Sequence, residues 1–149
     1  MKKALSILMF LLVPLLIVGC SQKEIMFNHT ELKEELKKEG ISPKLPTSFP
    51  MTIVEYERVI PPHETNINEV IFKGEEGMRL SLTIEPPQVE YHNLQYQEDV
   101  TINGNDGFFI EGPGPSIHWT DGDYHYILTY FTDEKVTKEM MVAVAESFQ

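Results

Sequence analysis

The chain has 149 residues, with 12 Lys and Arg against 23 Asp and Glu, and a formal net charge of −11. This length accommodates one domain and hardly two, and an apolar fraction of 42% can build a core, so wholesale disorder is not expected. The acidic balance argues against a nucleic-acid partner. The single cysteine excludes an internal disulfide framework and a multi-cysteine zinc site.

Residues 1–19 have the layout of a signal peptide. Lys2 and Lys3 precede a segment from Ala4 to Val18 that is almost wholly apolar, as expected when positive charge stays on the cytoplasmic side while an apolar segment inserts. The segment is shorter than the roughly 20 residues that a spanning helix needs. The pattern therefore favours a targeting segment over a permanent transmembrane helix.

The signal peptide ends at Ile17-Val18-Gly19-Cys20, which resembles a bacterial lipobox. The resemblance implies diacylglycerol on the Cys20 sulfur, cleavage before Cys20 and a further acyl chain on the new amino group. Two or more acyl chains, at about 0.8 kcal/mol per buried CH₂, give a stable membrane anchor. The alternative is a buried structural thiol at the end of an uncleaved signal anchor. The expected location is thus the extracytoplasmic face of the cell membrane.

Cleavage also changes the charge of the chain. Loss of Lys2 and Lys3 lowers the formal net charge from −11 to −13. We expect anionic lipid to repel such an acidic body, which would then stand off the surface on its tether.

The segment 20–44 is expected to be a lipidated tether followed by a short helix, and 45–149 a separate domain. Ser21–Asn28 is the expected tether. Thr30–Gly40 has a helical pattern, with Thr30 as the N-cap and Gly40 as the stop. Its only apolar residues, Leu32 and Leu36, form a narrow stripe. This predicts a loosely docked or free helix, with a partner-binding helix as the alternative.

Strand patterns follow from Met51 onward, over Met51–Ile60, Val70–Lys73, Met78–Glu85, Asp99–Ile102 and Phe108–Glu111. Strict alternation in the first strand places Val54 on one face with Tyr56 and Arg58. Alternation is clearest in Met78–Glu85, where the residues on one face are Met78, Leu80, Leu82 and Ile84.

A hairpin is predicted near the C-terminus, with Asp121-Gly122 as a type I′ turn between Ser116–Thr120 and Asp123–Phe131. This register pairs Thr120 with Asp123, Trp119 with Tyr124, His118 with His125 and Ile117 with Tyr126. In this register one face of the hairpin is apolar. It carries Ile117, Trp119, Tyr124, Tyr126, Leu128 and Tyr130.

A last helix is predicted over Lys138–Phe148, with Thr137 as its cap. Its apolar stripe holds Met141, Val144, Ala145 and Phe148. Consecutive strands and a closing helix predict an α+β fold, a curved antiparallel sheet of about six to seven strands with the C-terminal helix on one face, preceded by a short N-terminal helix.

Several of these segments resemble the DUF4367 family of Gram-positive exported proteins. The motifs are Leu45-Pro46-Thr47-Ser48-Phe49-Pro50, Val100-Thr101-Ile102-Asn103-Gly104, Gly107-Phe108-Phe109-Ile110-Glu111, the Trp119–Tyr126 hairpin and Lys138–Phe148. The resemblance covers about Leu45 to Gln149 and departs at Met141 and Val144. It implies export, often in lipoprotein, anti-sigma or sporulation contexts. At the level of fold it is similar to half-barrel lipoprotein carriers, an analogy only.

Candidate site residues are few. His118 and His125, if paired across the hairpin, could share a metal ion with help from Asp121 or Asp123, or could be exposed residues on its solvent side. Trp119, Tyr124 and Tyr126 could cradle a ligand but more often form core. His63 and His92 are expected in solvated loops. No motif places two carboxylates as an acid–base pair, and no cofactor is expected.

Two functions remain open. The preferred one is a non-enzymatic, lipid-anchored binding domain, held at the membrane by its acyl chains, that contacts an envelope protein, polymer or lipid. The alternative is a metal- or carboxylate-dependent envelope hydrolase. A cleft in which His, Asp or Glu side chains converge would favour the hydrolase.

Overall fold

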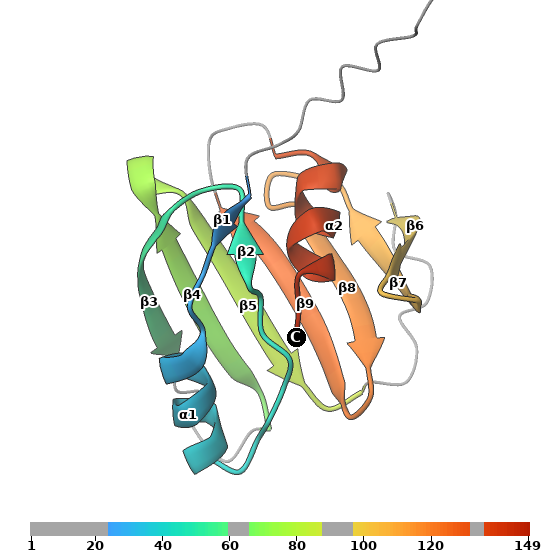
Figure 1. Ribbon diagram of the computed structural model, residues 1–149. Coiled ribbons are helices and arrows are strands. Elements are labelled where there is room, and N and C mark those ends of the chain that lie inside the picture. Colours follow the sequence, from blue (N-terminus) through green and yellow to red (C-terminus); the bar gives the residue numbers. More distant parts are fainter. Residues whose placement is uncertain (1–23, 60–65, 88–96, 132–135) are drawn as a thin grey trace, which may run out of the picture.

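Seven antiparallel strands form one open sheet in the computed structural model, which describes residues 24–59, 66–87, 97–131 and 136–149 (Figure 1). The order is β3-β4-β5-β9-β8-β7-β6, and a separate two-stranded ribbon pairs β1 with β2. The predicted α+β class is confirmed. The bounds are β1 Ile25–Met26, α1 Thr30–Lys38, β2 Ser48–Phe49, β3 Ile53–Val59, β4 Asn68–Gly74, the 3₁₀ turn η1 Glu75–Gly77, β5 Arg79–Glu85, β6 Gln97–Ile102, β7 Asn105–Ile110, β8 Ser116–Asp121, β9 Tyr124–Phe131 and α2 Lys138–Glu146.

Four of the predicted features lie outside the described residues. They are the signal peptide 1–19, Cys20, His63 and His92. The helices of the described part are all too short or too polar to cross a bilayer.

Two sets of hairpins join at the middle of the sheet, where β5 pairs with β9 although they are far apart in the sequence. The predicted alternation of β5 is confirmed, because Leu80, Leu82 and Ile84 all lie on the face that the helices cover. We call this the helix-covered face. The opposite side, which carries Ser81 and Glu85 on the same strand, is called the second face.

The predicted alternation of β3 is wrong at Val54. Ile53 pairs with Gly74 and Glu55 with Lys73, so Val54 is an extra residue that forms a β-bulge. The bulge turns Val54 outward, 62% exposed, whereas Ile53 and Tyr56 pack against the core.

The β8–β9 hairpin is present, but its predicted register is wrong. Asp121 pairs with Tyr124, Thr120 with His125 and Trp119 with Tyr126, which replaces the predicted pairs Thr120–Asp123, Trp119–Tyr124, His118–His125 and Ile117–Tyr126. The turn residues are therefore Gly122 and Asp123. Gly122 has a φ of +60° and Asp123 does not have a positive φ, as in a type II′ turn with glycine first. Because the partners shift by two residues, the predicted apolar face is kept.

The α1 helix is not loosely docked, contrary to expectation. Leu32 and Leu36 are fully buried, and the Tyr56 hydroxyl of β3 donates to Glu35 at 3.3 Å. Thr30 is the first helical residue rather than the N-cap, which is His29. Gly40 ends the helix as predicted, with a φ of +84°.

Part of the predicted tether is also structured. Ile25 and Met26 form β1 and pair with Phe49 and Ser48 of β2. Phe27, the next residue, packs edge-on against Phe49 and Phe72, with both ring centroids at 5.4 Å. Phe27 and the α1 leucines therefore belong to the same core as the sheet.

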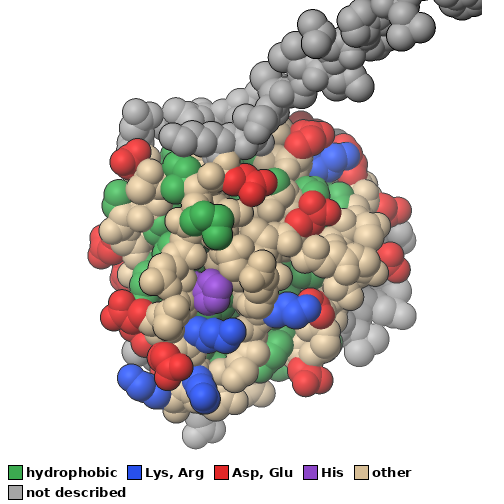
Figure 2. Space-filling view, in the orientation of Figure 1, with side chains coloured by type: hydrophobic (Ala, Val, Ile, Leu, Met, Phe, Trp, Pro, Cys, Tyr) green, Lys and Arg blue, Asp and Glu red, His purple; other side chains and the backbone are tan. Residues whose placement is uncertain are grey.

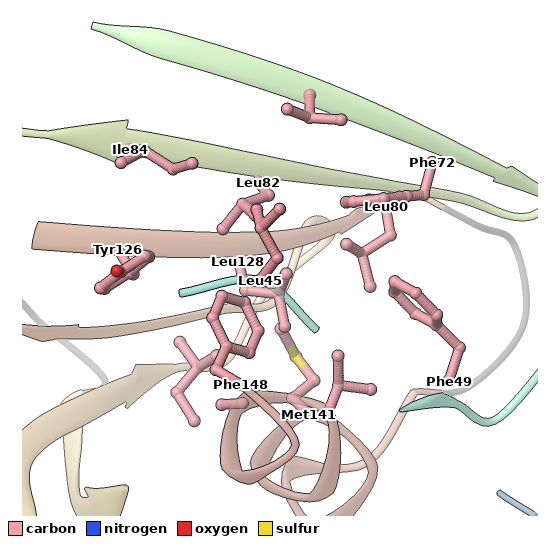
Figure 3. Packing of buried hydrophobic residues seen from close by; sticks show 14 of the residues in the cluster. Leu45, Phe49, Phe72, Leu80, Leu82, Ile84, Tyr126, Leu128, Met141 and Phe148 are labelled. Carbon is pink, nitrogen blue, oxygen red and sulfur yellow. The ribbon is translucent and has the colours of Figure 1, made fainter. Parts of the chain in front are cut away.

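The α2 helix closes the helix-covered face. Thr137 caps it as predicted, accepting a hydrogen bond from the Met140 N–H at 3.3 Å, but the helix ends at Glu146 rather than Phe148. Figure 3 shows Met141 and Phe148 directed at the sheet, near Leu128 and Tyr126. The predicted apolar stripe is confirmed, because Met141, Val144, Ala145 and Phe148 are all buried.

Candidate functional site

The centre of the second face is polar and buried. The buried polar side chains on it are Ser81, Glu85, Ser116, His118 and His125, each between 4% and 8% exposed. Burial of an ionisable group is costly unless it is paired or neutral, so this cluster is the most unusual chemical feature of the described sheet. It lies on the three central strands β5, β8 and β9.

His118 is held by its own strand and by its neighbour. Its Nε2 shares a hydrogen bond with the Ser116 Oγ at 3.0 Å, and its ring stacks on Phe108 of β7 with centroids 4.6 Å apart. Burial lowers the pKa of His118 to about 4, and the charge of His125 adds to the shift. The imidazole is therefore neutral at pH 7.

His125 has a similar arrangement one step along the sheet. Its Nδ1 shares a hydrogen bond with the Thr120 Oγ1 at 2.9 Å. Burial lowers its pKa as well, although the negative charge of Glu85, its partner across β5 and β9, opposes that shift. The expectation that the two histidines are exposed is wrong, because the second face is buried at its centre.

His118 and His125, considered from the sequence as a possible metal pair, do not lie directly opposite each other. The two imidazole centroids are 6.0 Å apart, but His118 pairs with Ile127 and His125 with Thr120, so they are diagonal rather than directly opposite. Asp121 is engaged by the Lys44 ammonium at 2.6 Å. Among the described residues, no three His, Cys, Asp or Glu side chains are close enough to share a metal ion.

Two of the three predicted ligand-binding aromatics, Trp119 and Tyr126, belong to the core, whereas Tyr124 is half-buried and lines a cavity of about 300 Å³. Trp119 and Tyr126 are 2% and 1% exposed, and their rings stack at 5.0 Å beneath Phe148, which follows the end of α2. Helix α2 covers them, so they cannot cradle a ligand in this arrangement. Burial raises the pKa of Tyr126 to about 12.

Tyr124 and Tyr126 have a structural use that their sequence positions did not reveal. The Tyr126 hydroxyl accepts a hydrogen bond from the Lys44 N–H, and the Tyr124 hydroxyl accepts one from the Ser42 N–H, both at 3.0 Å. These bonds fix the extended segment between α1 and β2 against the hairpin. Partners this far apart in the sequence leave no local pattern.

An open cavity of about 560 Å³ lies beside the first turn of α2. Lys138 and Glu98, which line the cavity, form an ion pair. Phe109 contributes an aromatic side chain to the lining. The complete lining is Glu98, Phe109, Glu111, Gly112, Pro113, Pro115, Val136, Thr137, Lys138 and Glu139. None of the predicted site residues lines this cavity.

Sequence reasoning missed the partners that make the second face polar. Ser116 and Thr120 alternate with Ile117 and Trp119 in β8, which marks a polar side but not its burial. A strand with two buried faces would be recognised only if its central position in the sheet were known. That position depends on the β5–β9 pairing, which no local motif specifies.

Comparisons of the chain with family models, with curated proteins and with solved structures find no match. The DUF4367 resemblance therefore stays a prediction.

Proposed function

We propose that this protein is a lipid-anchored extracytoplasmic lipoprotein whose domain binds a partner at the cell envelope without catalysing a reaction. The observation that carries the proposal is the Ile17-Val18-Gly19-Cys20 motif, which ends five residues before the first strand at Ile25. A lipid on Cys20 would thus be joined by a few residues to a domain with a core of its own. The acyl chains, rather than a spanning helix, would hold that domain at the membrane.

The burial of the second face supports binding over hydrolysis. A general base or nucleophile has to come within hydrogen-bond reach of its substrate, and Ser116 and His118 are only 8% and 7% exposed. The open cavity beside α2 has a different composition, with acidic residues, one lysine and apolar walls. Such a surface suits recognition of a ligand by shape and charge.

The anchor is tested with a Cys20→Ala variant of the full chain, compared with a Ser21→Ala variant that leaves the motif intact. We expect the natural chain and Ser21→Ala to be processed, labelled by fed radioactive palmitate and recovered with the membranes. Cys20→Ala should accumulate as an unlabelled precursor. Processing of Cys20→Ala at the same site would contradict the proposal, and so would an unlabelled natural chain.

A further inference from the structure

We propose that the end of the domain where β1 begins is a membrane-contacting surface, and that Met26, Val54 and Phe131 enter the headgroup region of the bilayer. The inference rests on the proposed function, since it takes Cys20 as the acylated residue. It goes further by naming the lipid surface as the partner of one end of the fold, and it therefore departs from the expectation that the acidic chain stands off the membrane.

Exposed apolar side chains gather at this end. The three most exposed large apolar residues among those described are Met26, Val54 and Phe131, at 77%, 62% and 53%. Scattered apolar residues on a surface are ordinary. These three share one end of the molecule, because the start of β1, the start of β3 and the end of β9 all lie at its upper end in Figure 1. They do not share one face, since Phe131 is on the second face, as His125 is, whereas β1 lies on the helix-covered side.

The strand register agrees with this placement. Ile53, next to Val54, pairs with Gly74 at the end of β4, and Phe131 pairs with Arg79 at the start of β5. Val54 and Phe131 therefore lie on either side of η1, the connection between β4 and β5. Ile67, which precedes β4 at the opposite end, is less exposed, at 38%.

The length of chain between Cys20 and Ile25 limits where the bilayer can be. Five residues span at most about 18 Å, so the start of β1 lies within that distance of an anchor at Cys20. A folded chain of this size has a diameter of roughly 36 Å. The tether is therefore too short for the domain to invert and place its opposite end on the membrane.

Both signs of charge occur at both ends of the described molecule, since α1 also carries Glu31, Glu34 and Glu35. Lys33, Lys37 and Lys38 belong to α1, and Figure 2 shows most of the visible Lys and Arg side chains in the lower half of this face. Glu24, Glu75 and Glu139 are exposed near the upper end, but Lys73, Arg79 and Lys138 lie at the same end. Because the chain as a whole is acidic, we expect the contact to be made by apolar side chains rather than by attraction to anionic lipid.

Depth measurement tests the inference directly. Cys20 is the only cysteine in the chain, so in the acylated protein an introduced cysteine is the single free thiol. Met26→Cys, Val54→Cys and Phe131→Cys are each labelled with the same environment-sensitive fluorophore. The matched control is Lys38→Cys, an exposed position on α1 at the opposite end. The mature proteins are placed in phosphatidylcholine vesicles that carry a quencher just below the headgroups.

We expect severalfold stronger quenching and a blue-shifted emission at positions 26, 54 and 131 than at position 38. Equal quenching at all four positions, on protein that floats with the vesicles, would overturn the membrane-contacting surface and leave the anchor standing. A mature protein that does not float with the vesicles would overturn both the anchor and the contact surface.

Discussion

The two faces of the seven-stranded sheet are both buried at their centres, yet they differ in chemistry. On the helix-covered face, Leu82, Leu128 and Trp119 pack under α1 and α2 as an apolar core. On the second face, His118, His125 and Glu85 are buried in a polar environment. Apolar packing is insensitive to pH, whereas a buried histidine couples folding to protons. The comparison therefore predicts that volume changes damage one face and acid damages the other.

The largest expected effect on stability comes from a change at Gly107, which lies on the helix-covered face. It pairs with Trp119, and a Cβ there would come within 2.4 Å of the His118 carbonyl oxygen and 3.0 Å of the Trp119 Cβ. We expect Gly107→Ala to lower the free energy of unfolding by about 3 kcal/mol, measured by chemical denaturation. Gly112→Ala is the matched control, because a Cβ at Gly112 meets nothing within 4 Å. Equal stability of the two variants would show that β7 and β8 are not packed this closely.

His118 tests the second face by its response to acid. Its pKa in the folded state is lowered to about 4, so the unfolded chain binds the proton more readily, and stability falls as the pH drops below the ordinary value near 6.5. We expect this residue alone to cost about 2 kcal/mol of unfolding free energy between pH 7.5 and pH 5.

The measurement is denaturant unfolding across that interval for the natural chain and for His118→Gln, which cannot be protonated. Between pH 7.5 and pH 5 the unfolding free energy of the variant should fall by about 2 kcal/mol less than that of the natural chain. This difference does not depend on the stability of the variant at pH 7.5. Parallel curves would mean that His118 is not held neutral by burial.

Tyr126→Phe is expected to change the free energy of unfolding less than the two variants above. It tests whether the helix-covered face tolerates the loss of a single hydrogen bond. Tyr126→Phe removes the hydroxyl that accepts from the Lys44 N–H, and we expect it to lower the unfolding free energy by about 1 kcal/mol. Tyr124→Phe removes the equivalent bond to Ser42, which is exposed, so water can replace it at less cost. A larger loss in Tyr124→Phe would reverse this ranking.

Local patterns predicted the elements of this fold well, but not the details that depend on distant partners. Alternation in β5 and the Thr137 cap of α2 are local signals, and both are confirmed. The Asp121-Gly122 turn predicted from the sequence was wrong, because Gly122-Asp123 also suits a tight turn and no local signal separates the two. The bulge at Val54 has no residue type that marks it.

The candidate site was the less predictable part, for the same reason. Two apolar residues, Leu32 and Leu36, were too few to predict that α1 packs on the sheet. The core residues that they join lie much further along the chain. His118 and His125 look like surface residues in an alternating hairpin. Both are nevertheless buried on the second face, where the His118 ring stacks on Phe108 of the neighbouring strand, and the sequence around them does not mark this burial.

Intact-mass spectrometry of the mature protein, extracted from membranes with detergent, tests the anchor most directly. The account predicts an amino terminus at Cys20 whose mass exceeds that of the bare residue by a diacylglycerol group and, where the free amine is also modified, by one acyl chain. A chain that still begins at Met1, or that begins at an unmodified Cys20, would contradict it.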